Sequence, residues 1–137
     1  MIMNLEQYLE DADKYVEESN FLLENVPQLY KDIYLINSLN FDLANGGVYQ
    51  WLINRCGNYA DDTICALKRV GALNVARIVQ DIVDDFPDQN IPKNELVRIK
   101  LIESMVNRVA QQWTEKGDLI LEWPDDIDSL LRAYVKE

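Results

Sequence analysis

The feature that most constrains the fold of this chain is a long apolar run from Val26 to Ala44. At about 100° per residue, its apolar side chains occupy most sides of a helix and leave only a narrow polar strip. A helix of this kind has to be covered by other elements, so the run predicts a central helix at the hub of the core. Asn25 is the predicted N-cap, and Pro27 suits the first turn.

A corner follows directly at Asn45-Gly46-Gly47. Glycine reaches positive φ at no steric cost and asparagine tolerates it, so the triplet predicts a helix stop and a tight turn, with positive φ at Gly46. Residues 48–55 then predict a short helix with Trp51 facing inward. We interpret the corner as structural, because it locks the central helix against the helix of Trp51.

The remaining segments also show helical periodicity. Predicted helices cover residues 4–19, 59–70, 72–86 and 95–116, and a last helix opens at Pro124. No internal repeat or low-complexity linker separates them. The chain therefore predicts an all-α fold, a compact single-domain bundle of about six or seven helices spanning residues 1–137.

Asparagine and glycine mark several predicted helix ends. Asn58 is the predicted N-cap of the helix at 59–70, with Asp61 in a capping-box-like position. Gly71 and Gly117 are predicted helix stops. The apolar segment 119–123 is predicted to be extended.

The composition removes most catalytic devices. The chain has no histidine, which excludes Ser-His-Asp and Cys-His arrangements and removes the commonest zinc ligand. Glycine-rich phosphate-binding patterns are also absent. Paired carboxylates acting as acid and base stay formally open. Because no site is visible in the sequence, we expect a non-enzymatic protein without metal or cofactor.

The two cysteines, Cys56 and Cys65, form no CxxC pair, and we interpret them as small core residues in a reducing compartment. A disulfide between them would have to join two neighbouring helices. The N-terminus lacks the basic and apolar regions of a signal peptide, and no apolar run approaches the roughly twenty residues that cross a bilayer. We therefore expect a cytoplasmic protein that does not enter a membrane.

The net charge is the most unusual quantity in the composition. Twenty-four acidic and thirteen basic residues give a charge of −11. Such a surface repels nucleic acid and anionic lipid and attracts basic surfaces. It predicts a basic protein partner and no direct contact with nucleic acid. Solubility alone is the simpler explanation, and the distribution of the charge decides between the two.

The acidic residues are concentrated in the first predicted helix. Residues 1–30 carry seven acids against the single base Lys14. Four of them recur at i, i+4, i+7 and i+11, namely Glu6, Glu10, Asp13 and Glu17. A rise of about 6 Å over four residues sets these charges at about the interval between successive phosphates on one DNA strand. A solvated helix face is the alternative, but the lack of compensating lysine favours partner binding, because unrelieved repulsion is costly.

A second candidate patch lies near the end of the helix at 72–86. It consists of Asp81, Asp84, Asp85 and Asp88. The cluster lacks the glycine and the terminal glutamate of a calcium-binding loop, so it predicts a charged surface rather than a metal site.

A spaced set of glycine, amide and aromatic residues identifies a family resemblance. The set lies mainly within residues 28–90 and includes Asn45, Gly46, Gly47, Gln50, Asn54, Gly57, Tyr59 and Gly71. It resembles the bacterial domain of unknown function typified by the nineteen-kilodalton acidic DNA-mimic protein. Val48 departs from the family pattern, which usually has an aromatic residue there.

The resemblance implies an all-helical, non-enzymatic protein, often a homodimer, whose acidic surface engages a DNA-binding protein. The shared residues form a turn-and-packing motif, so they do not by themselves carry over the mimic function. Similar domains also resemble immunity proteins that neutralise bacterial toxins, and an acidic cover for a basic nuclease uses the same electrostatics. Three hypotheses therefore stand: a DNA mimic, an immunity protein against a basic toxin, and an acidic adaptor.

Overall fold

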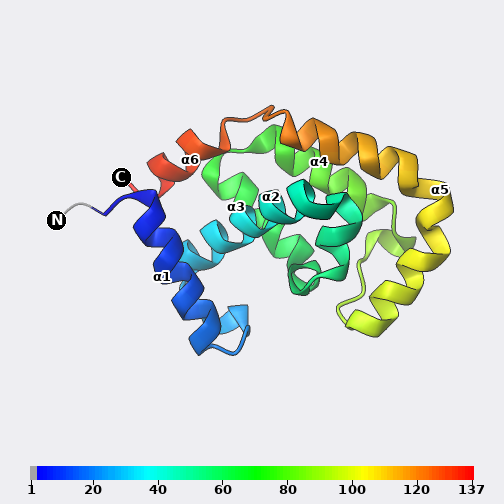
Figure 1. Ribbon diagram of the computed structural model, residues 1–137, viewed down its shortest axis with the longest axis horizontal. Helices are drawn as coiled ribbons and strands as arrows, with labels where there is room; N and C mark the ends of the chain where they lie inside the picture. Colours follow the sequence, from blue (N-terminus) through cyan, green and yellow to red (C-terminus); the bar gives the residue numbers. More distant parts are fainter. Residues whose placement is uncertain (1–2) are drawn as a thin grey trace.

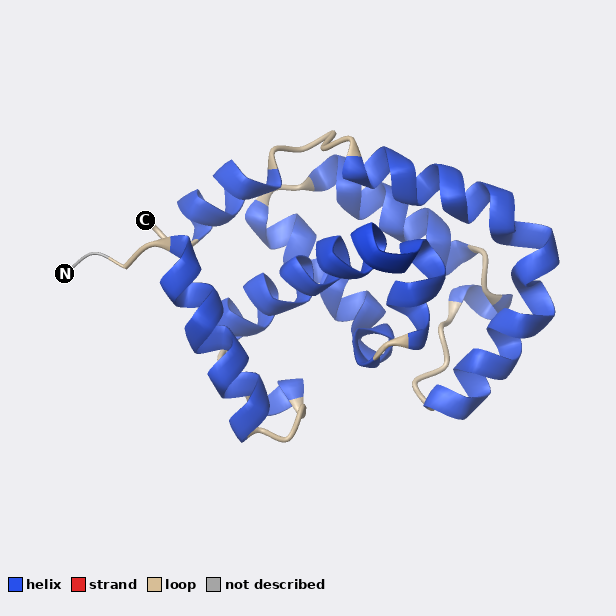
Figure 2. Cartoon of the chain, viewed as in Figure 1, coloured by secondary structure: helices blue, strands red, loops and turns tan. Residues whose placement is uncertain are grey.

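The elements are arranged around one long helix. The computed structural model describes residues 3–137, which form six α-helices and three 3₁₀ turns without a strand in that range (Figure 1; Figure 2). The predicted all-α fold is confirmed. The α-helices are α1 Leu5–Glu18, α2 Gln28–Ile53, α3 Ala60–Val70, α4 Leu73–Asp84, α5 Glu95–Leu121 and α6 Ile127–Tyr134, and the 3₁₀ turns are η1 Leu23–Asn25, η2 Arg55–Tyr59 and η3 Pro87–Gln89.

Helix α2 runs through the middle of the molecule and packs against α1, α3 and α5 (Figure 1). Ile33, Ile36 and Leu39 on this helix are fully buried, which confirms the predicted central helix. Its start differs from the prediction. Asn25 lies in η1, and α2 begins after Pro27, whose fixed φ starts the helix without a side-chain cap.

The corner after the apolar run is a kink within α2 rather than a helix stop. Gly47 alone leaves helical geometry, with φ 74° and ψ −164°, and the helix then continues to Ile53. This region of φ/ψ space is essentially open to glycine only. The predicted positive φ at Gly46 is therefore wrong by one residue. Gly46 is needed for space instead, because a Cβ there would lie 2.6 Å from the Cβ of Gln50.

Helix α5 is longer than predicted. It continues through Gly117 to Leu121, so both the predicted stop and the extended start of segment 119–123 are wrong. Gly117 is buried against α2, where an added Cβ would be 3.4 Å from Cγ2 of Val48. The glycine thus permits close approach of two helices, and packing outweighs its weak helix propensity.

Two predictions about α3 also change. The predicted cap Asn58 does not cap the helix; its side-chain oxygen accepts a hydrogen bond from Nη1 of Arg98 at 2.6 Å. Gly71 ends α3 with φ 91°, as predicted. Both cysteines are free, and Cys56 is buried, but Cys65 is exposed because it lies on the outer side of α3. Its predicted place in the core is wrong.

A fully buried arginine joins α5 to the turn after α2. The guanidinium of Arg98 donates to the carbonyl oxygens of Leu52, Asn54, Pro92 and Lys93 at 2.7–3.3 Å. Burial lowers the pKa of Arg98 from its usual value. The close packing around this guanidinium also explains why residue 57 is a glycine. A Cβ there would lie 2.8 Å from Nε of Arg98 and 2.3 Å from the carbonyl oxygen of Leu52.

A buried aspartate joins three helices at the opposite end of α2. Asp32 on α2 accepts hydrogen bonds from Nε and Nη2 of Arg69 on α3, both at 2.8 Å. It also accepts from the hydroxyl of Tyr134 on α6 at 2.6 Å and from Gln28 at 2.7 Å. The buried polar residue Asp32 of the central helix is therefore used for structural hydrogen bonds.

Candidate protein-binding surface

Helix α1 is fixed firmly enough to present a defined face. Asn4 and Gln7 form a capping box at its start, with hydrogen bonds of 3.0 and 2.9 Å between backbone and side chain. Leu5, Ala12 and Val16 are buried along one side of the helix. The opposite side consequently faces outward, at one end of the long axis of the molecule (Figure 1).

The four predicted carboxylates of α1 are all exposed, but they are not equivalent. Glu6, Glu10, Asp13 and Glu17 lie in exposed positions. Glu6 is paired with Nη2 of Arg132 on α6 at 2.7 Å, and this contact lowers its pKa. Arg132 also contacts Asp128 and Glu137. The expectation of an uncompensated row is therefore wrong at Glu6, because a distant arginine reaches it.

The other three carboxylates form no ion pair with any described residue. Glu10, Asp13 and Glu17 lie on successive turns of α1 without a basic partner. Partial burial, followed by the charge of Glu10, raises the pKa of Asp13. This uncompensated part of the row is called the α1 acidic face below and consists of Glu10, Asp13 and Glu17.

The second predicted patch is divided between surface and structure. Asp81, Asp84 and Asp88 are exposed. Asp85 instead accepts a hydrogen bond from Nε1 of Trp113 at 2.8 Å and forms an ion pair with Lys116 at 3.1 Å. This carboxylate holds α4 to α5, so its assignment to a partner surface is not supported by its contacts. The sequence shows the acids but not which of them find partners on another helix.

The two predicted patches do not form one surface. Helix α1 lies at one end of the long axis, whereas the carboxyl end of α4 lies beside α5 in the other half of the molecule (Figure 1). A partner that binds the α1 acidic face would therefore approach from a different side than one that binds Asp81, Asp84 and Asp88.

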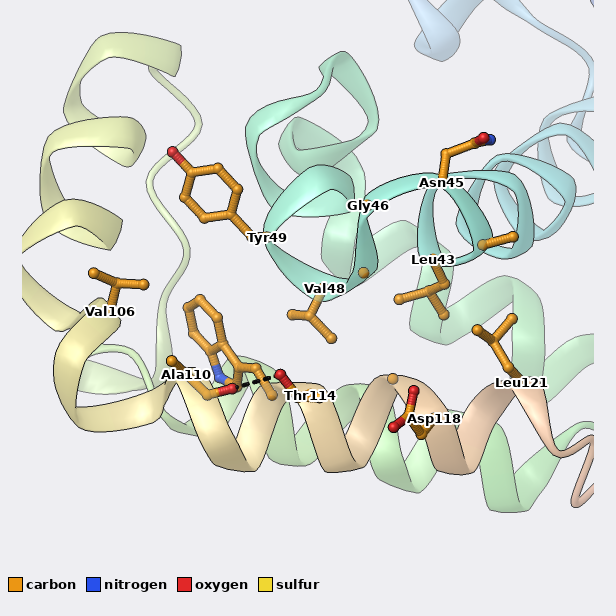
Figure 3. A pocket seen from close by; sticks show the side chains of 14 residues that line it. Leu43, Asn45, Gly46, Val48, Tyr49, Val106, Ala110, Thr114, Asp118 and Leu121 are labelled. Atoms are coloured by element: carbon orange, nitrogen blue, oxygen red, sulfur yellow. Dashed lines mark hydrogen bonds between the residues drawn. The ribbon is translucent and has the colours of Figure 1, made fainter.

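The family motif residues make packing contacts. The side chain of Asn54 donates to Asp42 at 2.9 Å, and the hydroxyl of Tyr59 donates to Glu24 at 3.0 Å. Asn45 donates to the carbonyl oxygen of Phe41 at 2.9 Å and points away from the adjacent groove (Figure 3). Together with the glycine contacts above, these bonds support a structural role for the motif.

A groove of about 420 Å³ lies between the Gly47 kink and α5 (Figure 3). Leu43 and Val48 form one wall, and Ala110, Thr114 and Gly117 form the other. The hydroxyl of Thr114 is directed to the carbonyl oxygen of Ala110 at 3.0 Å. The groove presents apolar and small side chains, and Asp118 at its edge is its one acidic residue.

Neither a metal-type cluster nor a membrane-spanning helix is found among the described residues. Across residues 3–137, no three histidine, cysteine, aspartate or glutamate side chains converge to hold a metal ion. None of the helices described for this range combines the length and apolar character needed to span a bilayer.

A family model described as DMP19-like protein matches residues 24–137. The chain belongs to this family. It is the DNA-mimic family that the glycine and asparagine motif resembles, so the resemblance is confirmed. Neither the curated proteins nor the solved structures contain a match to this chain. The family match begins at residue 24, after α1, so the α1 acidic face lies outside the matched part of the chain.

Proposed function

We propose that this protein is a non-enzymatic acidic module that occupies the basic, DNA-binding surface of another protein. The observation that carries the proposal is the α1 acidic face: three exposed carboxylates without an ion-pair partner among the described residues, on a capped and packed helix. A rigid row of like charge matches a groove of arginine and lysine that is built for a phosphate backbone. Membership of a DNA-mimic family supports the same class of partner.

The net charge of −11 adds long-range attraction to this local contact. Charge complementarity accelerates encounter and weakens steeply with salt. Binding through the α1 acidic face therefore predicts salt-sensitive capture that duplex DNA displaces, because both ligands compete for one basic surface.

The test is affinity capture from the source cells on the immobilised protein, washed across a salt series and then with duplex DNA. The variant Glu10→Gln/Asp13→Asn/Glu17→Gln removes the α1 acidic face and leaves the Glu6–Arg132 pair intact. The matched control Glu103→Gln/Glu115→Gln/Glu122→Gln removes the same charge from two exposed positions of α5 and from its exposed C-cap residue. We expect the first variant to lose the captured protein at lower salt and the control to retain it.

Three outcomes contradict parts of the proposal. Equal loss in both variants would show that total charge, not the α1 acidic face, governs binding. Unchanged capture in both would remove the electrostatic basis altogether. A captured protein that duplex DNA does not displace would exclude the mimic role; inhibition of a captured toxin would then indicate the immunity alternative.

A further inference from the structure

A second acidic feature lies in a pocket beside the α1 acidic face. The pocket has a volume of about 540 Å³ and is formed by α1, α2, η2 and Phe21 in the loop after α1. Asp13 belongs to both the acidic face and this pocket. The side chains that matter here are Asp13, Phe21, Tyr34, Phe41, Asp42 and Arg55.

Asp42 is a nearly buried carboxylate with an unused oxygen. The residue is only 7% exposed. Its Oδ1 accepts a hydrogen bond from Nδ2 of Asn54 at 2.9 Å, and its Oδ2 accepts none from the residues that the structure describes. This oxygen keeps contact with solvent, because Nε1 of Trp51 is the only fully buried side-chain nitrogen or oxygen without a hydrogen-bond partner among the described residues. An oxygen held in this way at a pocket wall is suited to an incoming donor.

Tyr34 lines the same pocket as the two carboxylates. Burial, with contributions from Cys56 and from the charges of Asp13 and Asp42, raises the pKa of Tyr34 to about 12. Its hydroxyl thus stays protonated at neutral pH. The pocket therefore combines two carboxylates from different helices with a neutral phenol.

The aromatic side chains of the pocket suit a cation. The guanidinium of Arg55 already lies over the ring of Phe21, with its Cζ 5.2 Å from the ring centroid. Arg55 lines the same pocket but forms no ion pair with a described acid, so Asp13 and Asp42 have no direct ion-pair partner there. Phe41 is 67% exposed and provides a second aromatic side chain that a planar guanidinium can stack upon.

We propose that this pocket receives an arginine side chain of the basic partner. The guanidinium would stack on Phe41, donate to the free oxygen of Asp42 and lie within the field of Asp13. The inference rests on the proposed function. The α1 acidic face binds through charge alone, and the pocket would add a contact with the same partner that depends on shape as well as charge. A flat guanidinium with several donors fits this combination better than a compact ammonium.

The test is a nuclear magnetic resonance titration of the full chain with N-acetyl-arginine methylamide as the probe. N-acetyl-citrulline methylamide is the matched control, because it keeps the planar shape and lacks the charge. We expect saturable shifts at the Asp42 carboxyl carbon, the Asn54 side-chain amide and the Phe41 ring. Binding of citrulline should be weaker by about tenfold or more, as expected for loss of a charged hydrogen bond.

Variants locate the binding. Asp42→Asn should weaken binding of the arginine probe by about tenfold or more, while the asparagine keeps the hydrogen bond with Asn54. Phe41→Ala provides a second test at an exposed position, where a loss of folding is not expected. Glu103→Gln on α5 should leave the titration unchanged. Equal binding of citrulline, equal binding by Asp42→Asn, or shifts spread evenly over the acidic surface would overturn the proposal.

The titration uses no partner protein, so it fails independently of the proposed function. Capture that survives in Asp42→Asn and Phe41→Ala, together with no probe shifts at the pocket, would remove the arginine pocket and leave the α1 acidic face as the binding site. Probe binding at the pocket without capture of a DNA-binding protein would keep the pocket and remove the mimic role.

Discussion

The body of the molecule and its first helix use charge in opposite ways. In the body, from α2 to α6, Asp32 and Arg98 are fully buried, and each is surrounded by hydrogen-bond partners. On α1, Glu10, Asp13 and Glu17 are exposed and lack ion-pair partners among the described residues. Buried charges tolerate no loss of partners, whereas exposed charges contribute little to stability and remain available to another protein.

The family match follows the same division. It covers residues 24–137 and therefore the buried charges, the Gly47 kink and the motif, but not α1. Membership thus concerns the body of the molecule, while the α1 acidic face lies outside the matched residues. The expected effects on stability should accordingly be large in the body and small on α1.

The largest effect is expected at Arg98. Replacing Arg98 by alanine leaves several buried carbonyl oxygens without a donor and opens a cavity, which should lower the free energy of unfolding by about 3–5 kcal/mol. Urea unfolding followed by circular dichroism measures the change. Lys100→Ala is the matched control, because Lys100 is exposed on the same helix. A loss at Arg98 no greater than at Lys100 would contradict the structural role of the buried guanidinium.

The next effect is expected at the kink. Gly47→Ala places a side chain at φ 74° and ψ −164°, which should cost about 1–3 kcal/mol through backbone strain alone, since the added Cβ meets open space. The same unfolding experiment measures it. D-Alanine at position 47, introduced by chemical ligation, is the control, because this φ/ψ pair is the mirror image of a conformation that L-residues adopt freely. Equal loss with both enantiomers would exclude strain as the cause.

The central helix, Arg98 and Gly117 show what the sequence could and could not predict. The apolar run 26–44 predicts the central helix because its hydrophobic pattern is local and strong. Arg98 gives no such signal. Two of its hydrogen-bond partners, Leu52 and Asn58, lie 40 or more residues away in the chain. The pattern of the sequence predicts a helix stop at Gly117, as glycine commonly follows a helix end. Only its packed neighbour Val48 shows that this glycine allows close helix packing instead.

The candidate site shows the same limit. The sequence predicts the charged row on α1 correctly as an exposed face. It misses the pairing of Glu6 with Arg132, which is 126 residues away, and the use of Asp85 as a partner of Trp113. The pocket at Asp42 is also missed, because it forms only when α1, α2 and η2 come together. Exposure follows from local periodicity, whereas pairing depends on tertiary contacts.

A smaller effect, visible in the pH dependence, is expected at Tyr134. Burial and the hydrogen bond to Asp32 raise the pKa of Tyr134 from 10.0 to about 12. A group whose pKa is raised in the folded state contributes stability below the unfolded value and loses it as the pH rises through the folded value. Stability should therefore fall between about pH 10 and pH 12. Tyr134→Phe should be about 1–2 kcal/mol less stable at pH 7 and lose less stability over that range.

Urea midpoints measured at pH 7 and across the alkaline range test this prediction. Tyr34 and Cys56 also have raised pKa values, so the fall should be reduced in Tyr134→Phe but not abolished. Tyr49→Phe is the control, because Tyr49 is exposed and donates no hydrogen bond to a described residue. An alkaline slope that is the same in Tyr134→Phe and in the unmodified protein would contradict the proton linkage to Asp32.

The smallest effect on stability is expected on α1. Replacing Glu10, Asp13 and Glu17 by their amides should change the free energy of unfolding by no more than about 0.5 kcal/mol, because the side chains are exposed and form no ion pair with described residues. Any change should be stabilising, since the substitution relieves repulsion between like charges on one helix. Urea unfolding measures the stability, and the capture experiment measures binding on the same samples. Loss of binding without loss of stability would sharpen the division between body and first helix. A destabilisation comparable to that of Gly47→Ala would show instead that these carboxylates belong to the structure, and their lack of partners would no longer indicate a binding face.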